Sequence, residues 1–76
     1  MKLTLTIMNC EKEKDIQVYS QQKIQETLVI LQKAGELWGY DPYMCKVKSA
    51  RRGIYIDTGH TYEDELIYTG DILEVL

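Results

Sequence analysis

The stretch that decides the fold runs from Ser20 to Gly35 and reads SQQKIQETLVILQKAG. At about 100° per residue, Ile24, Leu28 and Leu31 lie on one stripe of a helix. Ser20 is predicted to be the N-cap, because its hydroxyl can accept a bond from a free amide of the first turn. Gly35 suits the left-handed position that follows a helix end. A helix with one apolar stripe packs against another element, and the rest of the chain predicts only strands and turns.

Alternating segments on both sides of this helix predict a sheet. Apolar and polar side chains alternate with a period of two, which is the pattern of a strand with one buried face. Five strands are predicted in this way: residues 2–8, 15–19, 44–50, 54–56 and 72–76. A polar hairpin connection over residues 9–14 joins the first two, and residues 61–68 are irregular or form a single helical turn. The side chains expected to face the core are Leu3, Leu5, Ile7, Ile16, Val18, Cys45, Val47, Ser49, Tyr62, Ile67, Leu73 and Val75.

The order of the predicted elements is β-β-α-β-β-β, within one domain that spans residues 1–76. Two hairpins, one crossover helix and a returning last strand make the order of the β-grasp, an α+β fold whose mixed sheet wraps around one helix. The crossover rules favour the last strand beside the first, parallel to it and in the middle of the sheet. In the connection after the helix, Leu37 and Trp38 are predicted to close the core. An exposed Trp38 that anchors a partner is the alternative, because Trp is enriched at interface hot spots.

The composition limits the classes of function. The net charge is −3, which disfavours a nucleic-acid partner because such partners usually require a basic surface. No apolar run approaches the ~20 residues of a membrane span, so direct insertion into a membrane is not expected. Cys10 and Cys45 are too few for a disulfide framework and indicate a reducing, cytoplasmic compartment. Cys10 follows the first predicted strand and Cys45 begins the third, and the last strand is predicted to run between those two. The cysteines are then two strand spacings apart, together about 9.6 Å, which exceeds the ~7 Å limit for bridged Cα atoms, so both are predicted to be free thiols.

The sequence offers no constellation for catalysis. His60 is the single histidine, with Asp57 and Asp64 close to it in the chain. An acid–base role needs a substrate-facing site, whereas this histidine is predicted to lie in an exposed Thr-Gly-His turn without a positioned nucleophile. A metal site needs three or four convergent ligands, and an iron–sulfur cluster needs four thiolates. We therefore expect a protein that is not an enzyme and has no catalytic residue, no metal and no cofactor.

The uncovered face of the sheet is the candidate surface for protein partners. Alternation places polar and apolar side chains outward there, and a second candidate on the helix lies about 130° from the apolar stripe. The predicted partner-binding residues are Met8, Lys46, Lys48, Ile72, Glu74 and Leu76 on the sheet and Val29 on the helix. A sheet face that contacts only solvent is the alternative.

Three segments carry a resemblance to a known family: TLVILQKAG at residues 27–35, CKVKSARRGIYID at residues 45–57, and TYEDELIYTGDILEVL at residues 61–76. In outline the chain looks like ubiquitin, with its first strand, the helix-ending glycine and the turn into the last strand at matching places. It more closely resembles the YukD-like (EsaB-like) ubiquitin-like proteins of bacterial type VII (WXG100) secretion systems. The pattern of Ile67, two residues, Gly-Asp, an apolar residue and Leu73 is the most family-like piece.

The resemblance implies a small cytoplasmic accessory protein that works with membrane-bound components of the secretion machinery and is not conjugated to targets. Conjugated relatives need a flexible Gly-Gly tail, whereas this sequence reads Val75-Leu76 at its end. Lys48 stands at the centre of the face that commonly carries an apolar patch in ubiquitin-like folds, which is a departure from ubiquitin. Two other functions stay open: a sulfur carrier or protein modifier, and a small RNA-binding β-grasp domain, for which Arg51 and Arg52 offer slight support.

Overall fold

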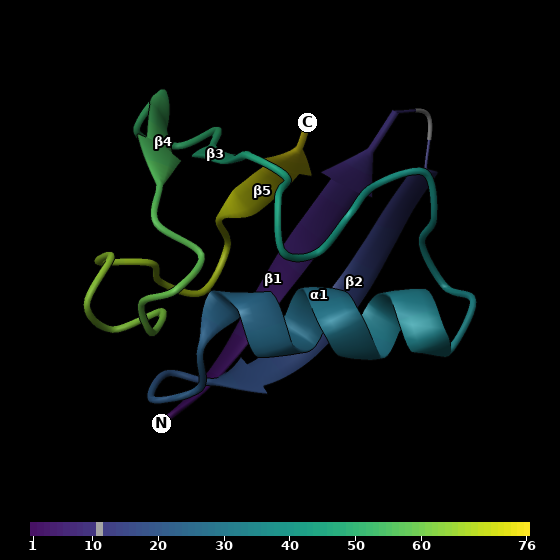
Figure 1. The fold of residues 1–76 in the computed structure, drawn as a ribbon. Helices are drawn as coiled ribbons and strands as arrows, with labels where there is room; N and C mark the ends of the chain where they lie inside the picture. The colour runs from purple at the N-terminus through teal and green to yellow at the C-terminus, as the bar shows by residue number, and fades with distance from the viewer. Residues whose placement is uncertain (11) are drawn as a thin grey trace.

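The computed structural model describes residues 1–10 and 12–76, and Figure 1 shows one helix lying across a single sheet. The elements are β1 (Lys2–Asn9), β2 (Lys12–Tyr19), α1 (Ile24–Lys33), β3 (Val47–Ser49), β4 (Ile54–Ile56) and β5 (Ile72–Val75). The strand order is β2-β1-β5-β3-β4. β5 runs parallel to β1, and the other three pairings are antiparallel. The structure therefore confirms the predicted β-grasp order and the central position of the last strand.

The strand boundaries differ from the predicted ones on both sides of the helix. β1 and β2 extend to Asn9 and Lys12, so the first hairpin connection is much tighter than residues 9–14. β3 covers only Val47–Ser49 instead of residues 44–50. The cause lies at Asp41, whose carbonyl accepts the amides of residues 44 and 45 at 3.0 and 2.8 Å, so this segment is a turn.

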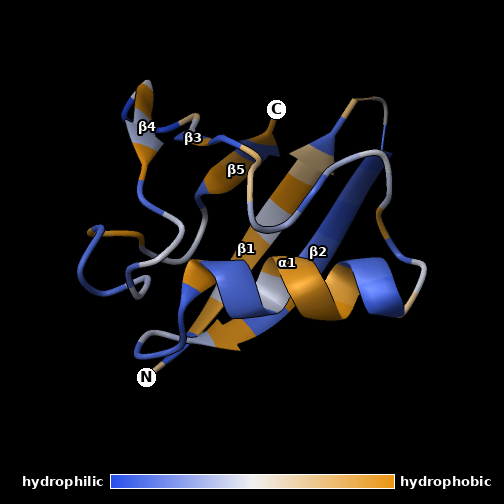
Figure 2. Ribbon diagram, in the orientation of Figure 1, coloured by the Kyte–Doolittle hydropathy of each residue, from blue (hydrophilic) through white to orange (hydrophobic). Residues whose placement is uncertain are grey.

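The apolar stripe of the helix forms one side of the core. Ile24 and Leu28 are fully buried and Leu31 is nearly so. They pack over the inward side chains of the sheet, and Figure 2 shows apolar and polar positions alternating along β1. The predicted inward residues of the five strands and of the irregular segment are confirmed, with Ile16 and Cys45 partly buried at the margin of the core.

The helix begins differently from the prediction. Ser20 is not the N-cap: α1 starts at Ile24, and Lys23 precedes it without a side-chain cap. The amides of Ile24 and Gln25 instead donate to the carbonyls of His60 and Thr58, at 3.1 and 2.9 Å. A backbone segment from the far end of the chain therefore satisfies amides that are usually bonded by a capping side chain.

The other end of the helix follows the prediction. Gly35 has φ +71°, and its amide donates to the carbonyl of Gln32 at 3.1 Å. The amide of Glu36 donates to the carbonyl of Leu31 at 3.0 Å. These two bonds make the Schellman ending, which requires a left-handed residue and favours glycine.

Trp38 lies outside the core, so its predicted burial is wrong. Its side chain is 54% exposed, whereas that of the neighbouring Leu37 is 1% exposed. In this connection it is Tyr40 that packs partly buried against the core, and its hydroxyl donates to the carbonyl of Leu28 at 2.7 Å. The Trp38 ring instead lies under the ammonium of Lys12, which is 3.8 Å from the ring centroid.

The two cysteines differ in exposure and are therefore expected to differ in reactivity. Cys10 is exposed, whereas Cys45 is partly buried beside the core, and burial raises the pKa of the Cys45 thiol. Because the thiolate is the reactive form, a disulfide reagent should modify Cys10 first and Cys45 more slowly in the native protein. Mass spectrometry of the unreduced protein at timed intervals measures both steps, and denaturant should bring the two rates together. An intramolecular disulfide, or faster modification of Cys45, would contradict the structure.

Candidate functional site

The open face of the sheet, opposite α1, presents the six sheet residues that the sequence singled out. In β5, Ile72 and Glu74 alternate with the buried Leu73 and Val75. Directly paired residues of neighbouring strands share one face, and Glu74 is paired with Met8 of β1 and with Lys48 of β3. These side chains therefore form one row across the middle of the sheet.

The apolar part of this face is small and interrupted. Leu76 is 60% exposed and Ile72 is 38% exposed, whereas Met8 is half-buried. Glu74 lies between Ile72 and Leu76 along the same strand face. Leu76 stays attached to the sheet, because its backbone exchanges hydrogen bonds of 2.8 and 3.3 Å with Lys46. The face is thus a mixed surface rather than a continuous apolar patch.

Tyr55 is a residue of this face that the sequence reasoning missed. It is paired with Lys48 across β3 and β4, and its side chain is 59% exposed. The ammonium groups of Lys46 and Lys48 lie 5.9 and 6.0 Å from its ring centroid. The alternation of the short strand Ile54–Ile56 was the available signal, because the buried Ile56 forces its predecessor outward.

Charges of opposite sign occupy opposite halves of the open face. On β2, Glu13 is paired with Met8, and Asp15 accepts a hydrogen bond of 2.7 Å from the hydroxyl of Thr6. On the other side, Lys48 lies in β3 and Lys46 precedes that strand. Acidic side chains thus lie over β2 and basic ones over β3, and a further acid, Glu74 of β5, lies beside Lys48.

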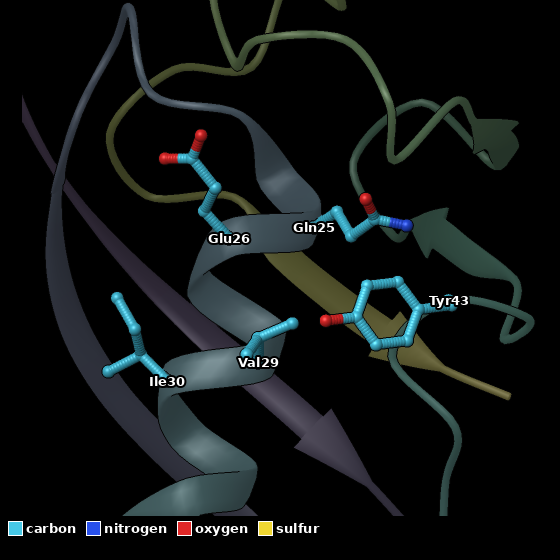
Figure 3. Close-up of a pocket in the computed structure, with 5 residues that line it drawn as sticks. All are labelled: Gln25, Glu26, Val29, Ile30 and Tyr43. Atoms are coloured by element: carbon cyan, nitrogen blue, oxygen red, sulfur yellow. The ribbon is translucent and has the colours of Figure 1, made fainter.

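Val29 was predicted to project from the exposed side of the helix, and the structure corrects this. Val29 is half-buried, and the neighbouring Ile30 is the exposed apolar residue, at 57%. Figure 3 shows why: the ring of Tyr43, from the loop after the helix, lies beside Val29. A groove of about 330 Å³ remains there, lined by Gln25, Glu26, Val29, Ile30 and Tyr43.

The Gly-Asp pattern before β5 has a structural role. Asp71 is 1% exposed, and its carboxylate accepts hydrogen bonds from the hydroxyl of Ser49 at 2.8 Å and from its neighbour Ile72 at 2.8 Å. The amide of Arg51 donates to the same carboxylate at 3.2 Å. Asp71 therefore ties the start of β5 to the β3–β4 hairpin.

The histidine lies in an exposed turn, as predicted, but its main partner was missed. His60 Nδ1 lies 2.9 Å from Glu65 Oε2, and its Nε2 lies 3.6 Å from Asp57 Oδ2. The other oxygen of Glu65 accepts the amide of Asp57 at 2.9 Å. Asp64 makes no ion pair with the ring in the part of the chain that the structure describes. The contacts of Asp57, His60 and Glu65 thus link the two ends of the loop over residues 57–65.

These contacts predict a raised histidine pKa. The hydrogen bond to Glu65, followed by the charge of Asp57, raises the pKa of His60 above its ordinary value of 6.5. The associated stabilisation is therefore fully present below pH 6.5 and is lost as the pH rises through the raised pKa. An NMR pH titration should give a midpoint above 6.5, and Glu65→Gln should lower it. Asp64→Asn is the control with the smaller expected effect, and a native midpoint at or below 6.5 would contradict this assignment.

Among residues 1–10 and 12–76, no group of three or more His, Cys, Asp or Glu side chains is arranged to hold a metal ion. Within the same residues, α1 and the remaining structure provide no helix of the length and apolar character that a membrane crossing requires.

Comparison with solved structures identifies the architecture. A protein designed on the basis of ubiquitin aligns with a TM-score of 0.76 and 21% identity, over 99% of this chain and 87% of that one. The fold is the ubiquitin-like β-grasp. The solution structure of an N-terminal ubiquitin-like domain aligns with a TM-score of 0.73 and 7% identity, over 99% of this chain and 73% of that chain.

The C-terminal ubiquitin-like domain of mouse tubulin-specific chaperone e gives a TM-score of 0.70 and 17% identity, over 97% of this chain and 84% of that chain. No family model and no curated protein matches the sequence. The TM-scores establish the shared fold, whereas sequence identities this low do not indicate a shared function. A proposal about function therefore has to rest on the surface residues of this chain.

Proposed function

We propose that this ubiquitin-like domain is a non-catalytic module that docks on protein partners through the open face of its sheet, without covalent attachment. The observation that supports this proposal is the mixed row of Met8, Glu74, Lys48 and Tyr55 beside the exposed Ile72. Protein–protein interfaces are enriched in aromatic residues and Met, and their rims are polar. The groove beside Val29 lies along the helix, on the opposite side of the domain from this face.

We further propose that the partners are membrane-bound components of a bacterial type VII secretion system, contacted from the cytoplasm. The support for this finer proposal is the resemblance of the helix, the β3–β4 hairpin and the segment before β5 to the YukD-like proteins. The RNA-binding alternative loses support from the arginines. Arg51 and Arg52 each donate to a backbone carbonyl, that of Leu66 at 3.2 Å and that of Glu65 at 2.7 Å. Both side chains are thus engaged within the domain.

Co-purification from the native host tests the proposal. Tagged wild-type protein should recover the membrane-bound secretion ATPase, and Ile72→Glu should reduce that recovery at least about tenfold, because a charge at a central anchor disrupts an interface. Ile30→Glu is the matched control: it places the same charge on an exposed isoleucine of the helix groove. Circular dichroism verifies that both variants are folded.

Three outcomes would contradict this function. The wild type could recover none of the secretion components, or both folded variants could recover them equally well. A denaturing gel of the same samples could instead reveal covalent adducts of the domain, which would favour the modifier alternative.

A further inference from the structure

The divided charges of the open face are not neutralised within the domain. Four ion pairs occur among residues 1–10 and 12–76, and none of them involves Glu13, Glu74, Lys46 or Lys48. The acidic and basic halves are therefore both available to a surface that approaches the sheet. Opposite charges placed on two sides of one face also permit the face to complement a copy of itself.

We propose that a second copy of this chain docks on the open face in a weak isologous dimer, in which Glu13 of each copy faces Lys48 of the other. The inference rests on the proposed function only in taking the open face as the docking surface. It adds a regulatory consequence, because the dimer covers Met8 and Ile72 and so competes with any other partner for the same side chains.

The strand registers give the geometry of this dimer. Across β2, β1, β5 and β3, the residues Glu13, Met8, Glu74 and Lys48 stand in one row. A two-fold axis parallel to the strands, between β1 and β5, reverses this row in the facing copy. Glu13 then lies opposite Lys48, and symmetry repeats the pair. Facing sheets pack about 10 Å apart, a gap that extended Glu and Lys side chains bridge from the two sides.

The neighbouring row is compatible with the same axis. There Thr6 is paired with Ile72 and with Asp15. The reversal places Ile72 opposite Thr6, so the exposed isoleucine meets no charge. The apolar part of the interface would consist of Met8 and Ile72 from both copies, together with Thr6. The same reversal places Glu74 opposite Met8 and next to Lys48 of its own sheet, with the two Glu13–Lys48 pairs farther from the axis.

Other symmetric arrangements bring like charges together. An axis along β5 itself places Glu74 opposite its own copy. A second alternative joins the β2 edges of two copies as antiparallel strands. Directly paired residues then lie on the same face, so a register centred on Glu13, Lys14 or Asp15 places that residue opposite its own copy. Like charges directly opposite each other are destabilising. The face-to-face arrangement with the axis between β1 and β5 is therefore the one that the charges favour.

The size of the face limits the affinity. The Cα positions of the domain span 26 × 23 × 20 Å. One face therefore has a projected area of roughly 600 Å², so we expect it to bury less than the ~800 Å² per partner of a standard interface. We expect a dimer that forms at high protein concentration and weakens as salt screens its charge pairs.

Sedimentation velocity of the full chain tests the dimer. At about 1 mM protein and about 50 mM salt, the wild type should contain dimer, and the dimer fraction should fall at about 500 mM salt. Glu13→Lys and Lys48→Glu should each weaken association at least about tenfold, because each opposes like charges. An equimolar mixture of the two variants should restore association, since both pairs re-form with reversed sign. Lys33→Glu makes the same charge change on the helix and should leave the dimer unchanged.

The result decides between the alternatives. Restoration in the mixture supports the geometry and also shows that both variants are folded. A monomeric wild type at low salt, variants that associate normally, or a mixture that stays monomeric would each overturn the proposal. The proposed function is tested separately: a monomeric wild type that still captures the secretion ATPase through Ile72 keeps that function, and a dimer that captures none of its components loses it.

Discussion

Leu28→Ala is expected to lower the free energy of unfolding by about 2–5 kcal/mol, the range for truncating a buried leucine. Leu28 is fully buried at the centre of the helix stripe, where it packs over the sheet. A domain with 76 residues has a small core, so the loss is a large part of its total stability. Urea unfolding followed by circular dichroism measures the difference, with the slope of the transition verifying two-state behaviour.

Ile30→Ala is the matched control for this prediction. Ile30 lies two residues along the same helix but is 57% exposed. Its truncation removes little buried area, so we expect a change within about 0.5 kcal/mol, which is usual for surface substitutions. Equal destabilisation of the two variants would show that the helix presents a different face to the sheet.

Asp71→Ala is expected to destabilise the protein by about 3 kcal/mol, because it removes a charged acceptor and leaves its donors without a partner. The hydroxyl of Ser49 and the amides of Arg51 and Ile72 all donate to the carboxylate. Asp71 is 1% exposed, so water cannot readily replace it. Thermal unfolding should reveal the loss, and amide exchange should increase along the β3–β4 hairpin.

Two variants separate the acceptor role from other effects. Asp64→Ala removes an exposed aspartate and should change the stability by less than about 0.5 kcal/mol. Asp71→Asn keeps the shape and one acceptor oxygen, so its cost should lie between those of the two alanine variants. An Asp71→Ala protein as stable as the Asp64→Ala protein would contradict the anchoring role.

The sequence predicted the fold because its strongest patterns are local. Period-two alternation placed Leu3 and Leu73 inward, and helical spacing placed Leu28 inward, as the structure confirms. The element order then left few topologies. The open-face residues Ile72 and Glu74 were predicted by the same alternation, because fixing one face of a strand fixes the other.

The predictions that were wrong depend on contacts between distant segments. Ser20 has the chemistry of an N-cap, but carbonyls of residues 58 and 60 occupy that role. Helical spacing places Val29 among polar residues, away from the apolar stripe. A loop that returns over the helix nevertheless places Tyr43 beside it. Leu37 and Trp38 were both predicted to close the core, but only Leu37 is buried, and residue spacing alone does not determine this. Such choices depend on tertiary packing, which overrides local preference.

The capping of α1 by a distant loop has a consequence for how the protein folds. A helix with 10 residues is below the length at which isolated helices persist in water. Its first turn gains partners for Ile24 and Gln25 only when residues 58–60 reach it. The helix and the last loop therefore become stable together, through contacts of long sequence separation that slow folding. The amides of Ile24 and Gln25 should accordingly exchange with solvent only on global unfolding, although they lie in the first turn, where helices ordinarily fray.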